Sequence, residues 1–197
     1  FQPVSEHEQF LYLKEHVFPQ MARWEADSRD WHIWCAASST GEEPYTLAML
    51  CMDYLGLDYP NWDTQVLATD IDTHVLDIAR KGIYTKDSVE HLPHTYVRRF
   101  FRNYSDKEYQ VTKELKEQVL FRQFNLMNPL PFSRPLHVVF LRNVMIYFEE
   151  ETKLRLLNQI YDKLIPGGYL FIGSTESINQ NHGKFEYIKP SVYRKPL

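Results

Sequence analysis

Apolar runs of strand length alternate with amphipathic stretches of helix length along most of this chain. The apolar runs cover residues 32–37, 64–70, 136–141 and 169–173, and the stretches with helical spacing cover residues 6–20, 41–55, 74–82 and 149–164. Parallel strands need a crossover segment between them, which is usually a helix. The alternation therefore predicts an α/β fold, a mostly parallel sheet with helices on both faces, and a closing antiparallel hairpin over 185–195.

Residues that commonly start or stop helices lie at the ends of the helical stretches. We expect Thr73 to cap the helix over 74–82 and Gly82 to end it. The run Pro166, Gly167 and Gly168 is expected to stop the helix over 149–164 before the next strand begins.

One region departs from the alternation of strands and crossover helices. Apolar and polar residues alternate between Arg98 and Leu126, around Tyr109, Val111 and Val119. This period of two indicates strands rather than a helix. We therefore predict a small inserted β subdomain at about 101–122, and we regard it as the natural place for contact with a partner.

Length and charge limit the possible classes of protein. With 197 residues, of which 44% are hydrophobic, the chain is long enough for one well-buried domain. The net charge of −4 leaves no basic stripe for nucleic acid, and no apolar run approaches the roughly 18 residues that cross a bilayer. Cys35 and Cys51 are far apart and no signal peptide is evident, so we expect reduced buried thiols in a cytoplasmic protein.

A glycine turn between the first strand and its helix indicates a ligand site of an unusual kind. Such turns often hold phosphates, because free N–H groups and the helix dipole favour negative charge. Here Gly41 is followed at once by Glu42 and Glu43, which would repel a pyrophosphate. S-adenosylmethionine has no phosphate, and the ammonium of its amino-acid end would be attracted to carboxylates.

A second acidic segment, the sequence ATDID at 68–72, follows the second strand. A carboxylate at this place can accept hydrogen bonds from ribose hydroxyls, and Asp70 is a better candidate than Asp72. The alternative is structural: Glu42 and Glu43 then only satisfy the helix dipole, and Asp70 and Asp72 cap a helix.

Five motifs together resemble the catalytic domain of the CheR family of chemotaxis receptor glutamate methyltransferases. In chain order they are STGEEPYT at 39–46, ATDID at 68–72, FNL at 124–126, LRNVMIYF at 141–148 and GSTES at 173–177. The resemblance extends from about residue 6 to the C-terminus. It implies one Rossmann-like class I methyltransferase domain over residues 1–197, with the family's upstream helical domain outside this chain. It also implies a cytoplasmic protein that methylates glutamates on chemoreceptor helices.

The resemblance also implies roles for particular residues. Tyr147 would face the reacting centre, with Arg142 as the second catalytic residue. The cofactor S-adenosylmethionine, or its product S-adenosylhomocysteine, would be held by Gly41, Glu43, Asp70, Asn125, Leu126, Arg142 and Asn143. No metal is expected, because the histidines at 91, 94, 137 and 182 lack ligand spacing.

Two departures from the family pattern keep other functions open. Gln2 or Ser5 stands where the family has an arginine near the start of the domain. The segment 102–110 lacks the glycine-rich turn of members that bind a receptor's C-terminal pentapeptide, so we expect no such docking. The alternatives are a signalling module that binds S-adenosylmethionine or S-adenosylhomocysteine with weak or no transfer, and a methyltransferase acting on a small molecule.

Overall fold

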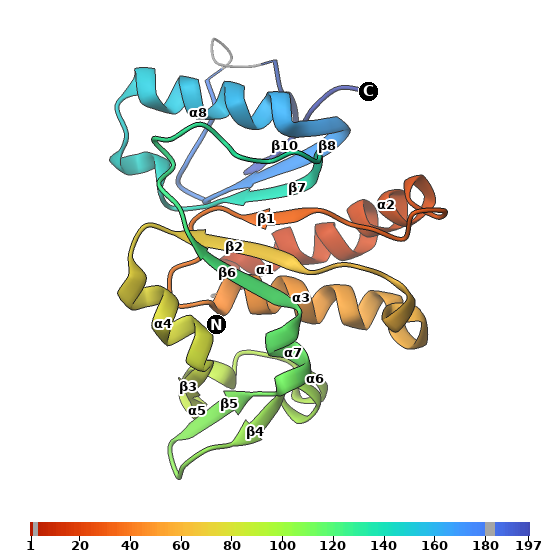
Figure 1. Ribbon diagram of the computed structural model, residues 1–197, viewed down its shortest axis with the longest axis vertical. Coiled ribbons are helices and arrows are strands. Elements are labelled where there is room, and N and C mark those ends of the chain that lie inside the picture. The colour runs from red at the N-terminus through yellow and green to blue at the C-terminus, as the bar shows by residue number, and fades with distance from the viewer. Residues whose placement is uncertain (2–3, 180–183) are drawn as a thin grey trace.

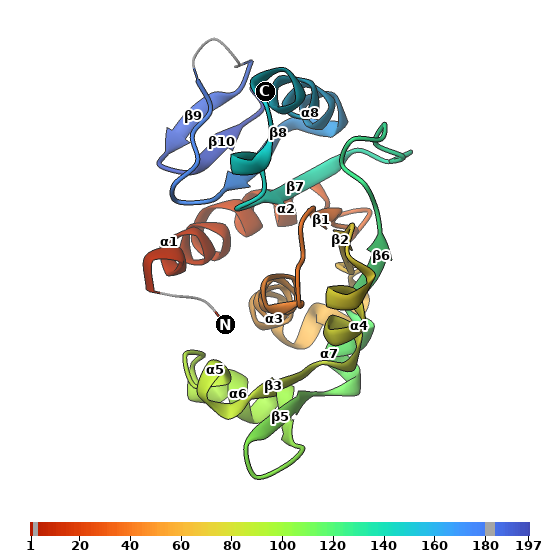
Figure 2. The ribbon, with the colours of Figure 1, turned by 90° about the vertical axis from the view of Figure 1, so that its left-hand side faces the viewer.

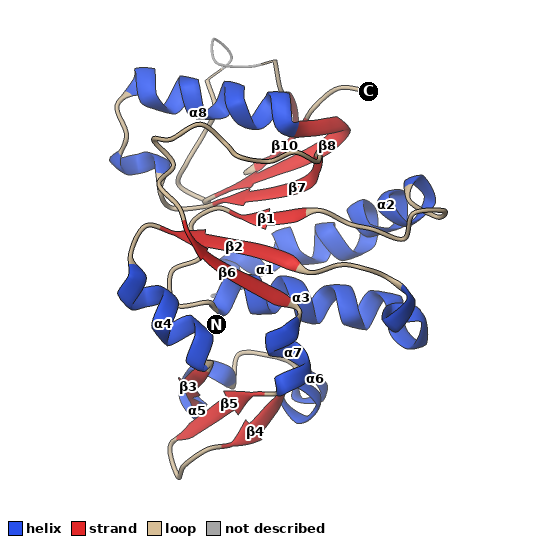
Figure 3. Cartoon of the chain, in the orientation of Figure 1, coloured by secondary structure: helices blue, strands red, loops and turns tan. Residues whose placement is uncertain are grey.

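The computed structural model describes residues 1, 4–179 and 184–197, with only the backbone described for 4–7. In this part of the chain a seven-stranded sheet has the order β6-β2-β1-β7-β8-β10-β9 (Figures 1 and 3). The strands are β1 (Ile33–Cys35), β2 (Val66–Asp70), β6 (Val119–Gln123), β7 (Leu136–Leu141), β8 (Leu164–Ile172), β9 (Glu186–Lys189) and β10 (Val192–Arg194). The pairs from β6 to β8 are parallel, whereas β10 is antiparallel to both β8 and β9. The predicted α/β sheet with its closing hairpin is therefore confirmed.

Helices cover both faces of the sheet. One face carries α1 (Val4–Tyr12), the π-helical turn η1 (Leu13–Val17), α2 (Phe18–Trp24), α3 (Glu42–Leu55) and α4 (Thr73–Lys81); the other carries α8 (Glu150–Lys163). Side chains of one strand alternate between two cores. Val138 and Phe140 of β7 join the core with α1 and α3, whereas Val139 and Leu141 join the core with α8. A strand buried on both faces is nearly continuously apolar, and β7 has only His137 as a polar residue, which is why the strand was recognisable in the sequence.

The cap of α4 differs from the prediction. Asp72, not Thr73, is the N-cap, and its carboxylate accepts a hydrogen bond from the N–H of His74. Asp is among the strongest N-cap residues, and here it stands one position before the predicted Thr. Gly82 ends the helix as predicted, with a φ of 64°. A Cβ at Gly82 would lie 2.4 Å from Val111, so close packing adds to the need for glycine.

The predicted stop after α8 is also different. The helix ends at Lys163, and β8 begins at the next residue, so Pro166, Gly167 and Gly168 lie within the strand. The register of β7 against β8 shifts between Leu136 and Val138, which accommodates this run. Proline and glycine are tolerated in strands at such irregularities.

The inserted subdomain has other boundaries than the predicted 101–122. Its three-stranded sheet has the order β3-β5-β4, formed by β3 (Ile83–Thr85), β5 (Glu108–Val111) and β4 (Phe101–Asn103). Short helices α5 (Lys86–Val89), α6 (His94–Phe100) and α7 (Lys113–Glu117) accompany it. Figure 2 shows that this unit lies below α3 and α4 and is separate from the main sheet. Residues 119–122, predicted as part of the insertion, instead belong to β6 (Val119–Gln123), the edge strand of the main sheet.

Two short 3-10 helices complete the fold, η2 (Gly56–Asn61) and η3 (Met145–Tyr147). No helix in the described ranges is long and apolar enough to cross a membrane.

Candidate active site

The site lies where the strand order reverses. Strands β2 and β6 lie in turn on one side of β1, and β7, the next strand in the chain, lies on the other side of β1. In open α/β sheets, ligands bind beyond the carboxyl ends of the strands at this switch point. The turn after β1 contains Gly41, and the turn after β7 contains Arg142 and Asn143, so both predicted segments flank this crevice.

The turn after β1 depends on a glycine. Gly41 is the N-cap of α3 with a φ of 100°, and a Cβ there would lie 2.9 Å from that of Ala79. The hydroxyl of Tyr84, which comes from the insertion, donates to the carbonyl of Thr40 at 2.6 Å. Burial raises the pKa of Tyr84, so the phenol remains a donor. The insertion thus helps to hold the turn in place.

Asp70 is joined to the same turn. One oxygen of its carboxylate accepts from the N–H of Ser39 at 2.9 Å, and the other accepts from the N–H of Asp72 at 3.0 Å. Asp70 therefore links the turn after β1 to the end of β2, whereas Asp72 caps α4. The two aspartates therefore have different surroundings.

A buried ion pair connects the turns after β1 and β7. Arg142 Nη1 lies 3.0 Å from Glu43 Oε2, and both side chains are largely buried. The thiol of Cys35 donates to the other oxygen of Glu43 at 3.2 Å. Burial, together with the neighbouring carboxylate of Glu43, raises the pKa of Cys35, so this cysteine remains a thiol. The charge of Glu43 is therefore compensated within the protein.

The turn after β7 is held in an uncommon conformation. Asn143 has a φ of 59°, which few residues other than glycine adopt readily. Its N–H donates to the carboxylate of Glu176, at 2.6 Å. Tyr147 ends the short helix η3 that follows, and its side chain is 79% exposed. The predicted catalytic tyrosine thus projects into solvent at this edge of the sheet.

The loop after β6 borders a small pocket. Asn125 lines it with Ile71, Phe124 and Asn128, and its volume is about 400 Å³. Leu126 is half-buried and packs against the core on the α8 side of the sheet. The structure thus places Asn125 at a cavity beside the end of β2, whereas Leu126, the next residue, packs against the core.

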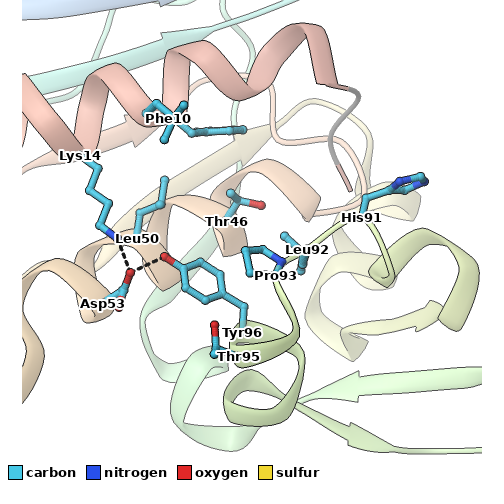
Figure 4. A pocket seen from close by; sticks show the side chains of 11 residues that line it. Phe10, Lys14, Thr46, Leu50, Asp53, His91, Leu92, Pro93, Thr95 and Tyr96 are labelled. Carbon is cyan, nitrogen blue, oxygen red and sulfur yellow. Dashed lines mark hydrogen bonds and ion pairs between the residues drawn. The ribbon is translucent and has the colours of Figure 1, made fainter.

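A larger pocket, of about 650 Å³, lies between the N-terminal helices and the insertion (Figure 4). Phe10 and Leu50 belong to its apolar walls. On its polar side the carboxylate of Asp53 pairs with Lys14 and accepts a hydrogen bond from the Tyr96 hydroxyl. The Phe10 ring also lies 5.9 Å from the guanidinium of Arg142, so this pocket adjoins the buried ion pair.

Several site residues were not singled out from the sequence. Ser39 and Tyr84 hold the glycine turn, and Glu176 binds the turn after β7. The hydroxyl of Ser38 is buried and has no hydrogen-bond partner among the described residues. Their positions in the sequence could have indicated these residues. Ser38 and Ser39 follow one buried strand, and Glu176 lies in GSTES directly after another. Gln2 lies outside the described residues, and so does the side chain of Ser5.

The fold and the site together define a class of enzyme. The parallel strands follow the Rossmann order, the last strand pair is antiparallel, and acids rather than phosphate-binding groups stand at the switch point. The buried Ser38 hydroxyl and the Asp70 carboxylate are polar groups suited to a nucleoside ligand. These features are compatible with the Rossmann-like fold of class I methyltransferases. Among the described residues no group of side chains could hold a metal ion.

Comparison with known proteins gives the family. Residues 4–194 match the family described as CheR methyltransferase, SAM binding domain, and the chain belongs to it. A chemotaxis protein methyltransferase of Borreliella burgdorferi is 37% identical over 193 residues, 96% of this chain and 68% of the relative. A probable one of Rhizobium etli is 32% identical, over 96% of this chain and 72% of the relative. The chemotaxis protein methyltransferase of Escherichia coli is 36% identical, over 93% of this chain and 65% of the relative.

Proposed function

We propose that this chain transfers the methyl group of S-adenosylmethionine to glutamate side chains on the cytoplasmic helices of chemoreceptors. Its family and its relatives, which are chemotaxis protein methyltransferases, support this assignment. The choice of a glutamate as methyl acceptor rests on one observation: the carboxylates at the site are already engaged in ion pairs or hydrogen bonds. Glu43 pairs with Arg142, Asp70 accepts from the N–H groups of Ser39 and Asp72, and Glu176 accepts from backbone N–H groups.

The engaged carboxylates favour an acceptor that needs no base. An amine or thiol must lose a proton before or during transfer, and a general base must then take that proton. A glutamate side chain is already ionised at pH 7, since its ordinary pKa is about 4.3. The reaction then depends mainly on position and on the removal of water. A carboxylate acceptor therefore fits this site better than an amine.

The proposed contacts to the cofactor come from the turns that border the crevice. Asp70 binds the ribose region, Asn125 and Leu126 border the adenosine, and the turn at Gly41 with Glu43 faces the amino-acid end. Asn143 and Arg142 line the opposite side. The buried hydroxyl of Ser38, which lacks a partner in the described residues, supports the presence of a polar ligand here.

Bound S-adenosylmethionine would supply an activated methyl group: its carbon–sulfur bond would break as the acceptor carboxylate oxygen bonds to the methyl carbon, and S-adenosylhomocysteine would leave. Arg142 balances the charge of Glu43, so an incoming carboxylate does not meet an uncompensated negative site. The exposed hydroxyl of Tyr147 is free to reach a protein substrate from solvent, and it donates a hydrogen bond that orients the acceptor. We place this reaction in the cytoplasm, with receptor helices as partners and no nucleic acid.

Replacement of Tyr147 by phenylalanine tests this assignment. The side chain is 79% exposed, so the loss of one hydroxyl should leave the fold unchanged. We expect methyl transfer to a receptor fragment to fall by about 10- to 1000-fold, the effect of losing one positioned donor. The affinity for S-adenosylhomocysteine, measured by calorimetry, should remain nearly the same.

Tyr187→Phe is the matched control, because this tyrosine on β9 is also exposed. It should not change the transfer rate. An unchanged rate in Tyr147→Phe would remove this residue from the mechanism. If the parent chain binds S-adenosylhomocysteine but labels no receptor fragment above a glutamate-to-glutamine control fragment, the assignment is wrong and a binding module is favoured.

A further inference from the structure

One carboxylate at the site has no role in the contacts proposed above. Glu176 lies just beyond β8 and is only 8% exposed. One of its oxygens accepts from the N–H of Asn143 at 2.6 Å and from the N–H of Gly173 at 2.9 Å. The other oxygen accepts from the N–H of Met145 at 2.9 Å. A single side chain thus joins the turn after β7 to the turn after β8.

The bonding pattern requires an acceptor at both oxygens of residue 176. Backbone N–H groups are donors with fixed positions, and each of these points at an oxygen of Glu176. A carboxylate is an acceptor at both oxygens, whereas a carboxamide of the same shape presents a donor at one end. In Glu176→Gln, one backbone N–H would therefore face an NH₂ group. Bonds to a buried charged acceptor are also stronger than bonds to a neutral one.

The segment that Glu176 holds contains the residues proposed for the reaction. Asn143, with its φ of 59°, precedes Met145, and Tyr147 follows two residues later in η3. Space around the carboxylate is tight: a Cβ at Gly173 would lie 2.3 Å from Asn143 Oδ1 and 2.7 Å from Glu176 Oε1. An unusual backbone conformation persists only when its surroundings hold it, and it is common at functional sites.

We propose that Glu176 is a positioning residue for methyl transfer. It holds the turn from Asn143 to Tyr147 in the conformation that directs Asn143 to the cofactor and the Tyr147 hydroxyl to the acceptor. The role rests on the proposed function of those two residues. Glu176 itself contacts neither the acceptor nor the methyl group in this scheme.

The test is a pair of single variants and their combination. Glu176→Gln keeps the shape and removes the second acceptor, and we expect kcat for methyl transfer to a receptor fragment to fall by about 10- to 100-fold. Because Glu176 acts through the position of Tyr147, the double variant Glu176→Gln/Tyr147→Phe should be about as slow as the slower single variant. Glu186→Gln, on the exposed face of β9, should leave kcat unchanged.

In the kinetic comparison, two outcomes overturn the proposal. One is a kcat within twofold of the parent in Glu176→Gln. The other is a double variant whose loss is the product of the two single losses, which would mean that Glu176 acts independently of Tyr147. If Glu176→Gln does not fold, Glu176→Asp replaces it, because aspartate retains the charge and is shorter by one methylene. The kcat values of Glu176→Asp, Tyr147→Phe and the double variant are then compared in the same way.

Amide hydrogen exchange separates this proposal from the proposed function. In Glu176→Gln the amides of Asn143 and Met145 should exchange at least tenfold faster than in the parent, while β1 and β7 stay protected. If the parent transfers no methyl group to receptor fragments, the proposed function fails and this exchange still tests the positioning. Unchanged exchange at Asn143 and Met145 overturns the positioning role whatever the activity.

Discussion

At the scale of single residues, neighbouring acids have different surroundings because of what lies across the crevice. Asp70 and Asp72 are two positions apart, yet one bonds the turn after β1 and the other caps α4. Glu42 and Glu43 are adjacent, yet the first accepts from the Thr40 hydroxyl and the second pairs with Arg142. Asp70 and Glu43 thus bond groups from other segments, whereas Asp72 and Glu42 bond groups two residues away in the chain.

The difference between the two aspartates gives a first test. Asp70→Ala should weaken the binding of S-adenosylhomocysteine at least tenfold, because it removes charged acceptors for the ribose and the bond to Ser39. Asp72→Ala should leave the affinity unchanged and lower the free energy of unfolding by about 1 kcal/mol through loss of the cap. Calorimetry and urea unfolding measure the two effects. Equal affinities in a folded Asp70→Ala and the parent would exclude Asp70 from the cofactor site.

At the scale of elements, a polar cluster joins three segments beside the larger pocket (Figure 4). Lys14 of η1, Asp53 of α3 and Tyr96 of α6 meet at one carboxylate. Burial raises the pKa of Asp53, but the hydrogen bonds from Lys14 and Tyr96 lower it more, so it lies below its ordinary value. The cluster ties the N-terminal helices and the insertion to α3.

This lowered pKa sets the direction of a pH dependence. A carboxyl whose pKa is lower in the folded state stabilises the fold above its unfolded pKa, about 3.9, and loses this effect as the pH falls through the folded value. Asp53→Asn should therefore lower the free energy of unfolding at pH 7 by about 1 kcal/mol, a small effect because the ion pair is partly exposed. The difference from the parent should shrink near pH 3.

Urea unfolding of parent and variant at both pH values measures this dependence. Asp77→Asn is the control, since Asp77 is exposed and its pair with Arg80 lies on one helix. It should change stability by less than about 0.5 kcal/mol at either pH. A difference between Asp53→Asn and the parent that is equally large at pH 3 and pH 7 would contradict the explanation by ionisation.

At the scale of the whole molecule, the insertion is a separate sheet, and its Tyr84 reaches the site. Tyr84 of β3 bonds the glycine turn, while the hairpin of β4 and β5 extends away from the main sheet (Figure 2). The turn of this hairpin, residues 104–107, contains no glycine. The resemblance to family members that bind a receptor's C-terminal pentapeptide does not extend to this turn.

We therefore expect no measurable binding of such a pentapeptide to this chain. Receptor fragments with and without the C-terminal segment should be methylated at the same rate, because recognition then depends on the methylated helices. Calorimetry with the isolated peptide and transfer assays with the two fragments measure this. Saturable binding that is lost on changing residues 104–107 would show that this hairpin docks the peptide without a glycine-rich turn.

The order and type of most elements follow from the amino-acid pattern alone. Strands buried on both faces are continuous apolar runs, as in 136–141, and the helices between them have one apolar side, so both follow from local pattern. Gly41 was recognisable for a similar reason, because a left-handed residue between a strand and a helix favours glycine. The motifs then placed the chain in its family.

Which segments and side chains meet depends on how the strands and helices pack together. The alternation over 119–123 fits an insertion strand equally well, and pairing with β2 is what assigns it to the main sheet. Arg142 and Glu43 are far apart in sequence and pair because β7 lies beside β1. Glu176 bonds Asn143 because β8 lies beside β7. Local pattern reports which residues are buried, but strand order determines their partners.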